Sequence, residues 1–306
     1  FESRLVPAGH NLAELRLRAA LHPAAAANEE MGGPSYLKFL RRLAKDVETD
    51  WDQVQKALET IRDTLFDRTT MLCDVTAEAD VWRLFEPELE RFLRGVPAPG
   101  GTPQPVSGTL DKRGEGLAIP SAVNFVAKGA NLPALGLAPT GATAAVTKYL
   151  NNTWLWDRVR VRGGAYGGTS RFDALSGGLV FLSYRDPNVL ATLDAYDGAG
   201  AFLGGDISPG DVTRSIIGAI GEADRPLLAD AKGMVSMQRW LCGLTDDVRQ
   251  ERRDQLLGAT VRDFHAFGAV LAEVARAGHV VAIGSETALQ AALAERPGLF
   301  EIEKLL

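Results

Sequence analysis

The chain has 306 residues, of which 46% are hydrophobic and 24% charged, a composition typical of a globular protein rather than a disordered or fibrous one. Its 33 basic and 39 acidic residues give a formal net charge of −6 and a pI near 5.4, so we expect no nucleic-acid partner. No apolar run approaches the about 20 residues that cross a bilayer, so we expect no membrane span. This length predicts about two domains.

The two cysteines, Cys73 and Cys242, lie far apart in apolar sequence surroundings. This pattern predicts two buried thiols in a reducing compartment and excludes a disulfide scaffold or a cysteine zinc site. The chain begins at Phe1 without methionine or a leader pattern, which is typical of a processed or truncated end.

The first part of the chain is predicted to be mostly helical. Apolar residues at helical spacing follow Ser35 and again follow Asp50, and each of these residues can cap a helix. A short strand is predicted over Thr69–Val75, followed by a helix that Thr76 caps. The prolines and glycines of 96–116 then predict a linker between domains.

Strands come first after the linker. Leu117–Ala127 has a strand pattern, 141–157 a helix pattern, and Tyr166–Phe172 with Leu179–Tyr184 the pattern of an antiparallel hairpin. Asp186–Pro187 predicts the start of a helix that runs to Leu203.

Helices dominate the remainder of the chain. Ser208–Pro209 predicts the start of another helix, one helix is expected over 229–241 and one after Thr245, and Thr260 with Asp263 resembles a capping box. His279–Ile283 is predicted to be a strand that leads into a helix capped by Ser285. Strands grouped before helices predict an α+β fold, with helices on one face of a mostly antiparallel sheet.

The usual catalytic motifs are absent from the sequence. None of the four histidines, His10, His22, His265 and His279, has the spacing of H-E-x-x-H or H-x-x-E-H, so each is expected at the surface or at a helix cap, and no metal site is expected in this chain. The sequence also contains no nucleophile elbow, P-loop or dinucleotide fingerprint.

The segment from Asn151 to Tyr184 carries the clearest candidate chemistry. Three arginines, at positions 158, 160 and 162, precede Gly163–Gly164 and a strand that begins near Tyr166. A guanidinium and a phenol placed there can donate hydrogen bonds to a carbonyl or to a developing oxyanion. The alternative is that the arginines complement the end of a helix and the glycines form its C-cap, and residue chemistry alone favours neither.

Several longer motifs resemble one family. These are Trp154–Arg160, Gly163–Gly168, Leu182–Asn188, Met31–Leu37, Tyr196–Gly198 and Asp230–Gly233. Together they resemble the C-terminal half of presequence proteases, a branch of the pitrilysin and insulysin family of zinc metallopeptidases with an inverted motif.

The resemblance implies a fold and a domain plan. It implies the family's α+β domain, of the LuxS/metallohydrolase-like type, with a mostly antiparallel sheet covered by helices and preceded by the helical end of a second such domain. Residues 1–95 would be the C-terminal part of the third family domain, 96–116 a linker and 117–306 the fourth domain. By the same resemblance Arg160 and Tyr166 would be the catalytic pair that contacts substrate, with Gly164 and Ala165 as substrate-binding residues.

The resemblance also implies a divided active site. Zinc would be bound by the N-terminal half of the same protease, this chain would bind no metal, and the isolated chain would be inactive. The substrates would be unstructured peptides, such as cleaved targeting presequences, held by strand addition at a sheet edge. The location would be the mitochondrial matrix or the chloroplast stroma. The alternatives are an inactive scaffold subunit of an organellar complex and an inert peptide-binding module made by truncation or proteolysis.

Overall fold

The computed structural model describes residues 2–101, 107–110 and 113–306, so part of the predicted linker lies outside the described residues. The chain divides into two compact units. The first contains the described parts of 1–37, 106–225 and 246–306, and the second those of 38–105 and 226–245. Residues before position 38 thus belong to the same compact unit as the C-terminal residues. The assignment of 1–95 and 117–306 to successive family domains stays a prediction.

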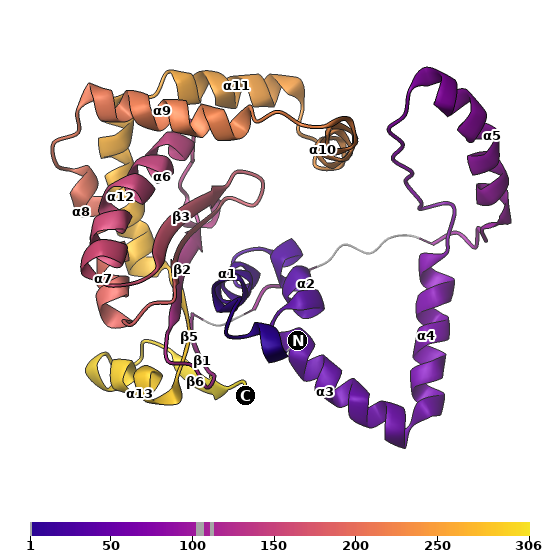
Figure 1. The fold of residues 1–306 in the computed structure, drawn as a ribbon, viewed down its shortest axis with the longest axis horizontal. Helices are drawn as coiled ribbons and strands as arrows, with labels where there is room; N and C mark the ends of the chain where they lie inside the picture. The colour runs from indigo at the N-terminus through magenta and orange to yellow at the C-terminus, as the bar shows by residue number, and fades with distance from the viewer. Residues whose placement is uncertain (1, 102–106, 111–112) are drawn as a thin grey trace. The chain divides into compact units, whose positions relative to one another are not determined.

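A six-stranded sheet forms the centre of the first unit (Figure 1). The strand order is β3-β4-β2-β5-β1-β6, in which three neighbouring pairs are antiparallel and β1 pairs in parallel with β5 and β6. The mostly antiparallel sheet of an α+β fold is therefore confirmed. The strands are β1 (Gly114–Ala118), β2 (Phe125–Asn131), β3 (Gly167–Asp173), β4 (Gly178–Tyr184), β5 (His279–Gly284) and β6 (Glu301–Lys304).

Both faces of this sheet are covered. One face packs against the apolar sides of α6, α7 and α12, and the opposite face packs against α1, which contacts β2, β4 and β5 (Figure 1). The expectation of helices on one face only is therefore wrong. Burial on both sides explains why β2 and β4 are almost continuously buried, since each side chain of these central strands meets a hydrophobic layer.

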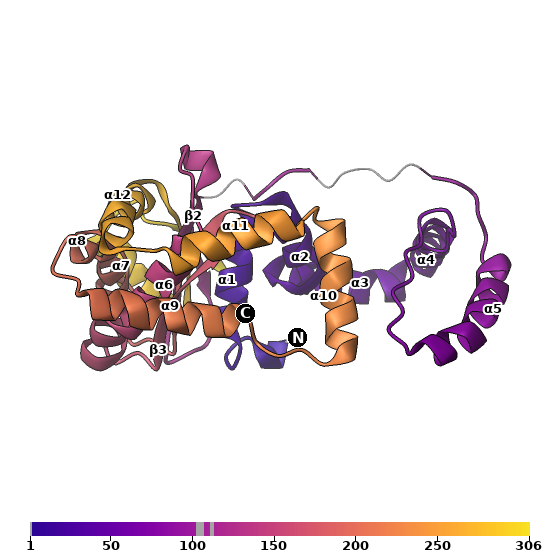
Figure 2. The ribbon, with the colours of Figure 1, turned by 90° about the horizontal axis from the view of Figure 1, so that it is seen from above.

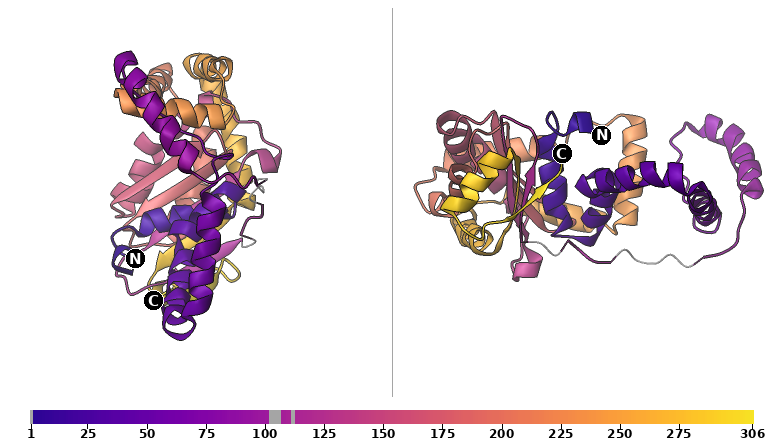
Figure 3. Two further views of the ribbon diagram at one scale, coloured as in Figure 1. Left: turned by 90° about the vertical axis from the view of Figure 1, so that its right-hand side faces the viewer. Right: turned by 90° about the horizontal axis from the view of Figure 1, so that it is seen from below.

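The helices of the first unit surround the sheet in two layers. Helices α9 and α11 lie side by side (Figure 2), and α13 packs beside β1 and β6 (Figure 3). The helices are α1 (Gly9–Ala19), α2 (Pro23–Gly32), the start of α3 (Pro34–Thr49), α6 (Ala142–Asn152), α7 (Leu190–Asp197), α8 (Ala199–Leu203), α9 (Pro209–Ala223), α11 (Asp246–Leu257), α12 (Val261–Ala277) and α13 (Glu286–Glu295), with short 3-10 turns at Glu2–Arg4 and Pro133–Leu135.

Local signals placed most helix starts correctly. The side chains of Ser208 and Asp211 form a reciprocal capping box, those of Thr260 and Asp263 form another, and Ser285 caps α13. Several predicted boundaries are wrong. The helix predicted from the Thr76 cap begins at Ala79 with Glu78 at its N-cap, and α3 begins at Pro34, so that Ser35 lies inside it. The segment Leu117–Ala127 is interrupted between β1 and β2, and the helix predicted from Asp186 begins at Leu190, because the Asp186 carboxylate is occupied in a buried network described below.

The second unit contains the remainder of α3 together with α4 (Trp51–Leu65), α5 (Ala79–Gly95) and α10 (Ala229–Leu241). None of α4, α5 and α10 has a buried residue. The strand predicted over Thr69–Val75 is wrong: the segment is a turn followed by irregular chain, since no neighbouring strand pairs with it in the structure. Both cysteines lie in this unit and are exposed, so the expectation of buried thiols is also wrong.

Candidate functional site

A π-helix carries the three arginines of the candidate site. The helix predicted over 141–157 ends at Asn152 as α6. After a short break the chain forms a π-helix, η3 (Trp156–Arg162), whose turns are wider than those of an α-helix. Such π-helical turns are uncommon and occur frequently at functional sites. The backbone N–H of Ala165 donates to the Val159 carbonyl at 3.1 Å, which closes this turn onto the start of β3. The helix therefore ends directly beside the sheet.

Gly164 makes the sharp turn between η3 and β3 possible. Its φ is +79°, in the left-handed region, where a residue with a side chain is strained. Its N–H donates to the Arg160 carbonyl at 3.0 Å. The turn thus brings the strand that follows Tyr166 back alongside the residues of η3.

Arg160 differs from the two arginines beside it. The Arg158 and Arg162 guanidinium groups lie 3.7 and 3.0 Å from the Asp157 carboxylate, whereas Arg160 has no carboxylate partner among the described residues. Its guanidinium lies instead over two aromatic rings, 4.3 Å from the Trp156 ring centroid and 5.7 Å from that of Tyr166. Its positive charge is therefore available to a ligand.

Tyr166 is held by its backbone while its side chain points into solvent. The side chain is 67% exposed, and its ring meets the Tyr184 ring edge-on at 5.8 Å and 86°. Its N–H donates to the Tyr184 carbonyl at 3.0 Å. Its hydroxyl has no hydrogen-bond partner in the described part of the chain, so this group too can serve a ligand. The structure thus places Arg160 and Tyr166 together on an exposed surface.

A buried polar network fixes the far side of the turn. Asp186 is completely buried, and its carboxylate accepts hydrogen bonds from the Asn188 N–H at 2.9 Å and the Thr192 hydroxyl at 2.6 Å. The Asn188 amide donates to the Gly163 carbonyl at 2.6 Å. Because Gly163 directly precedes Gly164, the residue with positive φ, this hydrogen bond stabilises the turn. Sequence reasoning treated Asp186 only as a helix cap, although the motif Leu182–Asn188 contained the signal.

Burial controls the ionisation of this network. Burial raises the pKa of Asp186 despite the hydrogen bond from Thr192. It also raises the pKa of Tyr196 well above the usual range, and the nearby Asp186 charge adds to the shift. The Tyr196 hydroxyl donates to the Val126 carbonyl at 3.1 Å and stays protonated. These groups support the site structurally and are inaccessible to a ligand.

The other two residues predicted to bind substrate differ in accessibility. Gly164 is exposed at the turn, whereas Ala165 is only 3% exposed and belongs to the main hydrophobic core. Any contact of Ala165 with a ligand would therefore be made through its backbone. The substrate contacts of both residues stay predictions.

His22 and His10 have structural roles. His22 accepts a hydrogen bond from the Ala24 N–H at 3.2 Å and caps α2, as expected. His10 packs edge-on against Tyr184 at 4.5 Å, and burial together with the Arg171 charge lowers its pKa. Across the residues that the structure describes, no group of three or more His, Cys, Asp or Glu side chains could hold a metal ion. A zinc site therefore does not fit the described residues.

No helix in the described part of the chain is long and apolar enough to cross a bilayer.

Comparison with known proteins identifies relatives that match most or all of the chain. Presequence protease 1, chloroplastic/mitochondrial, of Arabidopsis thaliana is 42% identical over 307 residues, which cover 100% of this chain and 28% of that protein. The mitochondrial presequence protease of Saccharomyces cerevisiae is 27% identical over 280 residues, which cover 86% of this chain and 28% of that protein. The chain thus spans 28% of the length of these relatives.

Solved structures resemble the chain more distantly. The crystal structure of pitrilysin aligns with a TM-score of 0.46 and 14% identity, covering 72% of this chain and 25% of that one. A peptidase M16 inactive domain from Pseudomonas fluorescens aligns with the same TM-score and 17% identity, covering 68% of this chain and 51% of that one.

A family model described as the PreP C-terminal domain matches residues 114–286, which include η3, the Gly163–Gly164 turn and the hairpin β3-β4. Because this match covers more than half of the chain, the chain belongs to the PreP C-terminal domain family, the family of the presequence proteases.

Proposed function

We propose that this chain is the C-terminal, substrate-binding part of a zinc metalloendopeptidase that degrades unstructured peptides, such as cleaved organellar presequences. The observation that carries the proposal is the exposed pair formed by Arg160 and Tyr166. Each has a hydrogen-bonding group without a polar protein partner in the described residues, and the Gly163–Gly164 turn holds both on one surface. The Arabidopsis relative, which matches over the whole chain, is named a presequence protease.

The two side chains suit different parts of a peptide. The Tyr166 hydroxyl can donate a hydrogen bond to the scissile carbonyl oxygen as negative charge develops on it, and the Arg160 guanidinium can hold a neighbouring backbone carbonyl. Stacking of Arg160 on Trp156 limits the conformations of the long side chain, so less entropy is lost when it binds. Loss of one such donor typically costs about 2.7–4 kcal/mol of transition-state stabilisation.

Zinc would come from the N-terminal half of the protease. A zinc ion bound there would supply the activated water of a metallopeptidase. On this proposal the present chain is inactive alone, and the N-terminal half is its partner. The names of the relatives favour the mitochondrial matrix or the chloroplast stroma as the location.

The test uses the complete protease that contains this chain, with a fluorogenic unstructured peptide as substrate. We expect Tyr166→Phe to lower kcat about 100- to 1,000-fold, and Arg160→Ala to lower kcat/KM strongly. Arg162→Ala is the matched control, because that guanidinium is exposed and already paired with Asp157. Addition of a chelator should abolish activity, and this chain alone should show none.

Equal activity of wild type, Arg160→Ala and Tyr166→Phe would contradict the assigned roles. Stable association of this chain with the N-terminal half without any peptidase activity would instead indicate a scaffold subunit.

A further inference from the structure

Arg185 has a backbone conformation that is rare for a residue with a side chain. Its φ is +49°, in the left-handed region, and no other described residue except glycine has a positive φ. Strand β4 pairs with β3 as far as Tyr184. The next bridge joins Asp186 to Asn124, so Arg185 forms the bend between the two pairings. Glycine adopts this conformation without strain, whereas a strained residue at such a bend is a feature that occurs frequently at functional sites.

The bend places the Arg185 side chain beside the Arg160–Tyr166 pair. Its guanidinium lies over the Tyr184 ring, 5.6 Å from the ring centroid. The Tyr184 ring meets the Tyr166 ring edge-on at 5.8 Å, and the Arg160 guanidinium lies over the Tyr166 ring. The Tyr166 N–H also lies 3.4 Å from the Arg185 carbonyl oxygen, besides its shorter bond to the Tyr184 carbonyl. These four side chains therefore form a continuous row.

Tyr184 provides a fixed support for the Arg185 guanidinium. Its ring packs edge-on against the His10 ring at 4.5 Å, and its centroid lies 6.1 Å from that of the buried Phe125 ring. Contact between a guanidinium and an aromatic face is attractive and limits the conformations of the arginine side chain. Arg185 is nevertheless exposed. Its charge is thus held at the surface, where a ligand can reach it.

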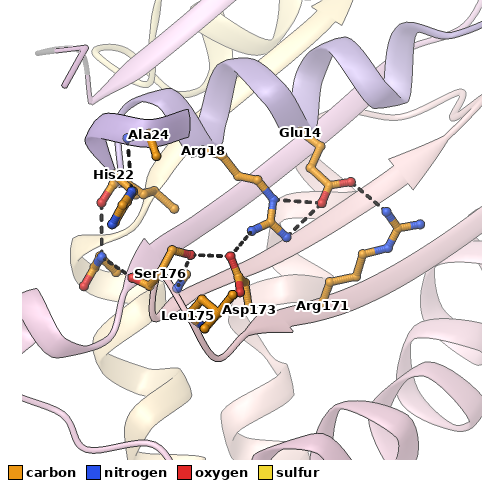
Figure 4. Close-up of polar contacts among 11 residues, drawn as sticks. Glu14, Arg18, His22, Ala24, Arg171, Asp173, Leu175 and Ser176 are labelled. Carbon is orange, nitrogen blue, oxygen red and sulfur yellow. Dashed lines mark hydrogen bonds and ion pairs between the residues drawn. The ribbon is translucent and has the colours of Figure 1, made fainter. Parts of the chain in front are cut away.

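No carboxylate in the described part of the chain pairs with Arg185. Two other arginines beside the β3-β4 hairpin are paired: Arg171 lies 2.8 Å from the Glu14 carboxylate, and Arg18 lies 2.9 Å from it (Figure 4). The chain has 39 acidic and 33 basic residues, so an unpaired guanidinium does not result from a shortage of carboxylates. With Arg160, the row contains two unpaired guanidinium groups, which suits a ligand that carries negative charge.

A carboxylate is the ligand group that fits Arg185 best. The planar guanidinium binds the two oxygens of a carboxylate through parallel hydrogen bonds, which combine charge with geometry. A peptide offers this group on an acidic side chain or at its C-terminus. A backbone carbonyl lacks the negative charge, so its hydrogen bond to Arg185 is weaker.

We propose that Arg185 is a specificity-determining residue that binds a carboxylate of the peptide held by Arg160 and Tyr166. This inference rests on the proposed function, because it assigns a further contact of the same peptide. The guanidinium groups of Arg160 and Arg185 lie over different rings, so the carboxylate belongs to another residue of the peptide than the one that Arg160 holds. Glycine at position 185 would relieve the strain but could not bind the carboxylate.

The experiment uses the complete protease that contains this chain and a series of fluorogenic unstructured peptides. The parent peptide has no acidic residue and has an amidated C-terminus. One arm places Glu or Gln at successive positions on either side of the scissile bond, and the other arm compares free with amidated C-termini. We expect the carboxylate to raise kcat/KM about 3- to 10-fold in one arm, which identifies its source.

Three variants test the role of the guanidinium. Arg185→Asn tolerates the left-handed conformation but lacks the charge, so the preference for the carboxylate should fall below about 2-fold while cleavage of the neutral peptide stays unchanged. A merely structural role would lower cleavage of both peptides alike. Arg185→Lys keeps the charge and should retain part of the preference. Arg162→Asn is the matched control, because it removes an exposed charge that is already paired with Asp157, and it should leave the preference unchanged.

Thermal unfolding separates this role from a structural one. Arg185→Gly should be at least as stable as wild type, because glycine relieves the strain, and yet it should lose the preference for the carboxylate. A Tm below that of wild type would show that Arg185 stabilises the fold and would overturn the proposal.

The same peptides distinguish failure of this inference from failure of the proposed function. No preference in wild type, or an unchanged preference in Arg185→Asn, would overturn the role of Arg185; if Arg160→Ala still lowers cleavage of every peptide, the proposed function stays intact. Equal cleavage by wild type, Arg160→Ala and Tyr166→Phe would overturn both.

Discussion

Replacement of Gly164 by alanine tests the backbone geometry of the site. Gly164 has φ +79°, and an added Cβ would meet only Pro187 Cγ at 3.6 Å, an ordinary contact. The cost of the substitution is therefore backbone strain rather than collision. Gly136 is the matched control: its φ is +75°, an added Cβ would meet nothing within 4 Å, and it lies in another turn of the same unit.

The left-handed conformation costs an alanine about 1–2 kcal/mol. Alanine also restricts the unfolded chain, which offsets about 0.4–1 kcal/mol of this strain. Both variants should thus lose about 1 kcal/mol of unfolding free energy, or about 2–4 °C in Tm. Gly164→Asn should lose less, because asparagine tolerates this conformation better.

The assay combines thermal unfolding of each variant with peptide cleavage by the complete protease. We expect Gly164→Ala and Gly136→Ala to lose the same stability. We expect reduced cleavage only for Gly164→Ala, because the turn at Gly164 holds Arg160 and Tyr166 and the turn at Gly136 does not. If Gly164→Ala were as stable as wild type while Gly136→Ala were destabilised, the left-handed turn at Gly164 would be refuted.

Three further predictions test the supporting structure. Burial raises the pKa of Asp186, so between about pH 4 and this raised pKa the folded state binds more protons than the unfolded state. The stability of wild type relative to Asp186→Asn should therefore fall as pH rises through this range. Urea unfolding of both proteins from about pH 4 to 8 measures the difference, and a constant difference would contradict the prediction. Glu115→Ala removes one carboxylate from the buried Arg16, which Glu115 binds at 2.7 Å. The free energy of unfolding, measured in urea, should fall by about 3–5 kcal/mol. A fall below about 1 kcal/mol would show that the ion pair is not buried as described. Leu150→Ala, at a fully buried position, should cost about 2–5 kcal/mol, whereas Leu84→Ala, 79% exposed, should change stability by less than about 0.5 kcal/mol; comparable losses would mean that α5 is packed.

Features encoded within a few neighbouring residues could be predicted from sequence. The hairpin of Tyr166–Phe172 and Leu179–Tyr184 is present as β3 and β4, and the capping signals at Ser208 and Thr260 begin helices where expected. Caps and tight turns depend on contacts three or four residues apart, so their signal is local. The family resemblance likewise rested on contiguous motifs.

Other predictions failed because they depended on distant partners. Thr69–Val75 has strand-forming residues, but no strand of the described ranges pairs with it, and the apolar surroundings of Cys73 in sequence do not bury its thiol. The four-residue strand β6 has no recognisable pattern, yet it joins the sheet because β1 lies beside it. No local rule could indicate these outcomes.

The candidate site shows the same division. Sequence alone determined that Arg160 and Tyr166 would lie near a glycine turn, because the turn is contiguous with both. Only the tertiary structure decided that Arg160 lacks, among the described residues, the carboxylate partner its neighbours have, that Asp186 is buried behind the turn, and that the Asn151 amide binds the edge of β3 at Ser170. The availability of a charge or of a backbone group depends on every element packed around it, and that packing is set by contacts between residues far apart in the chain.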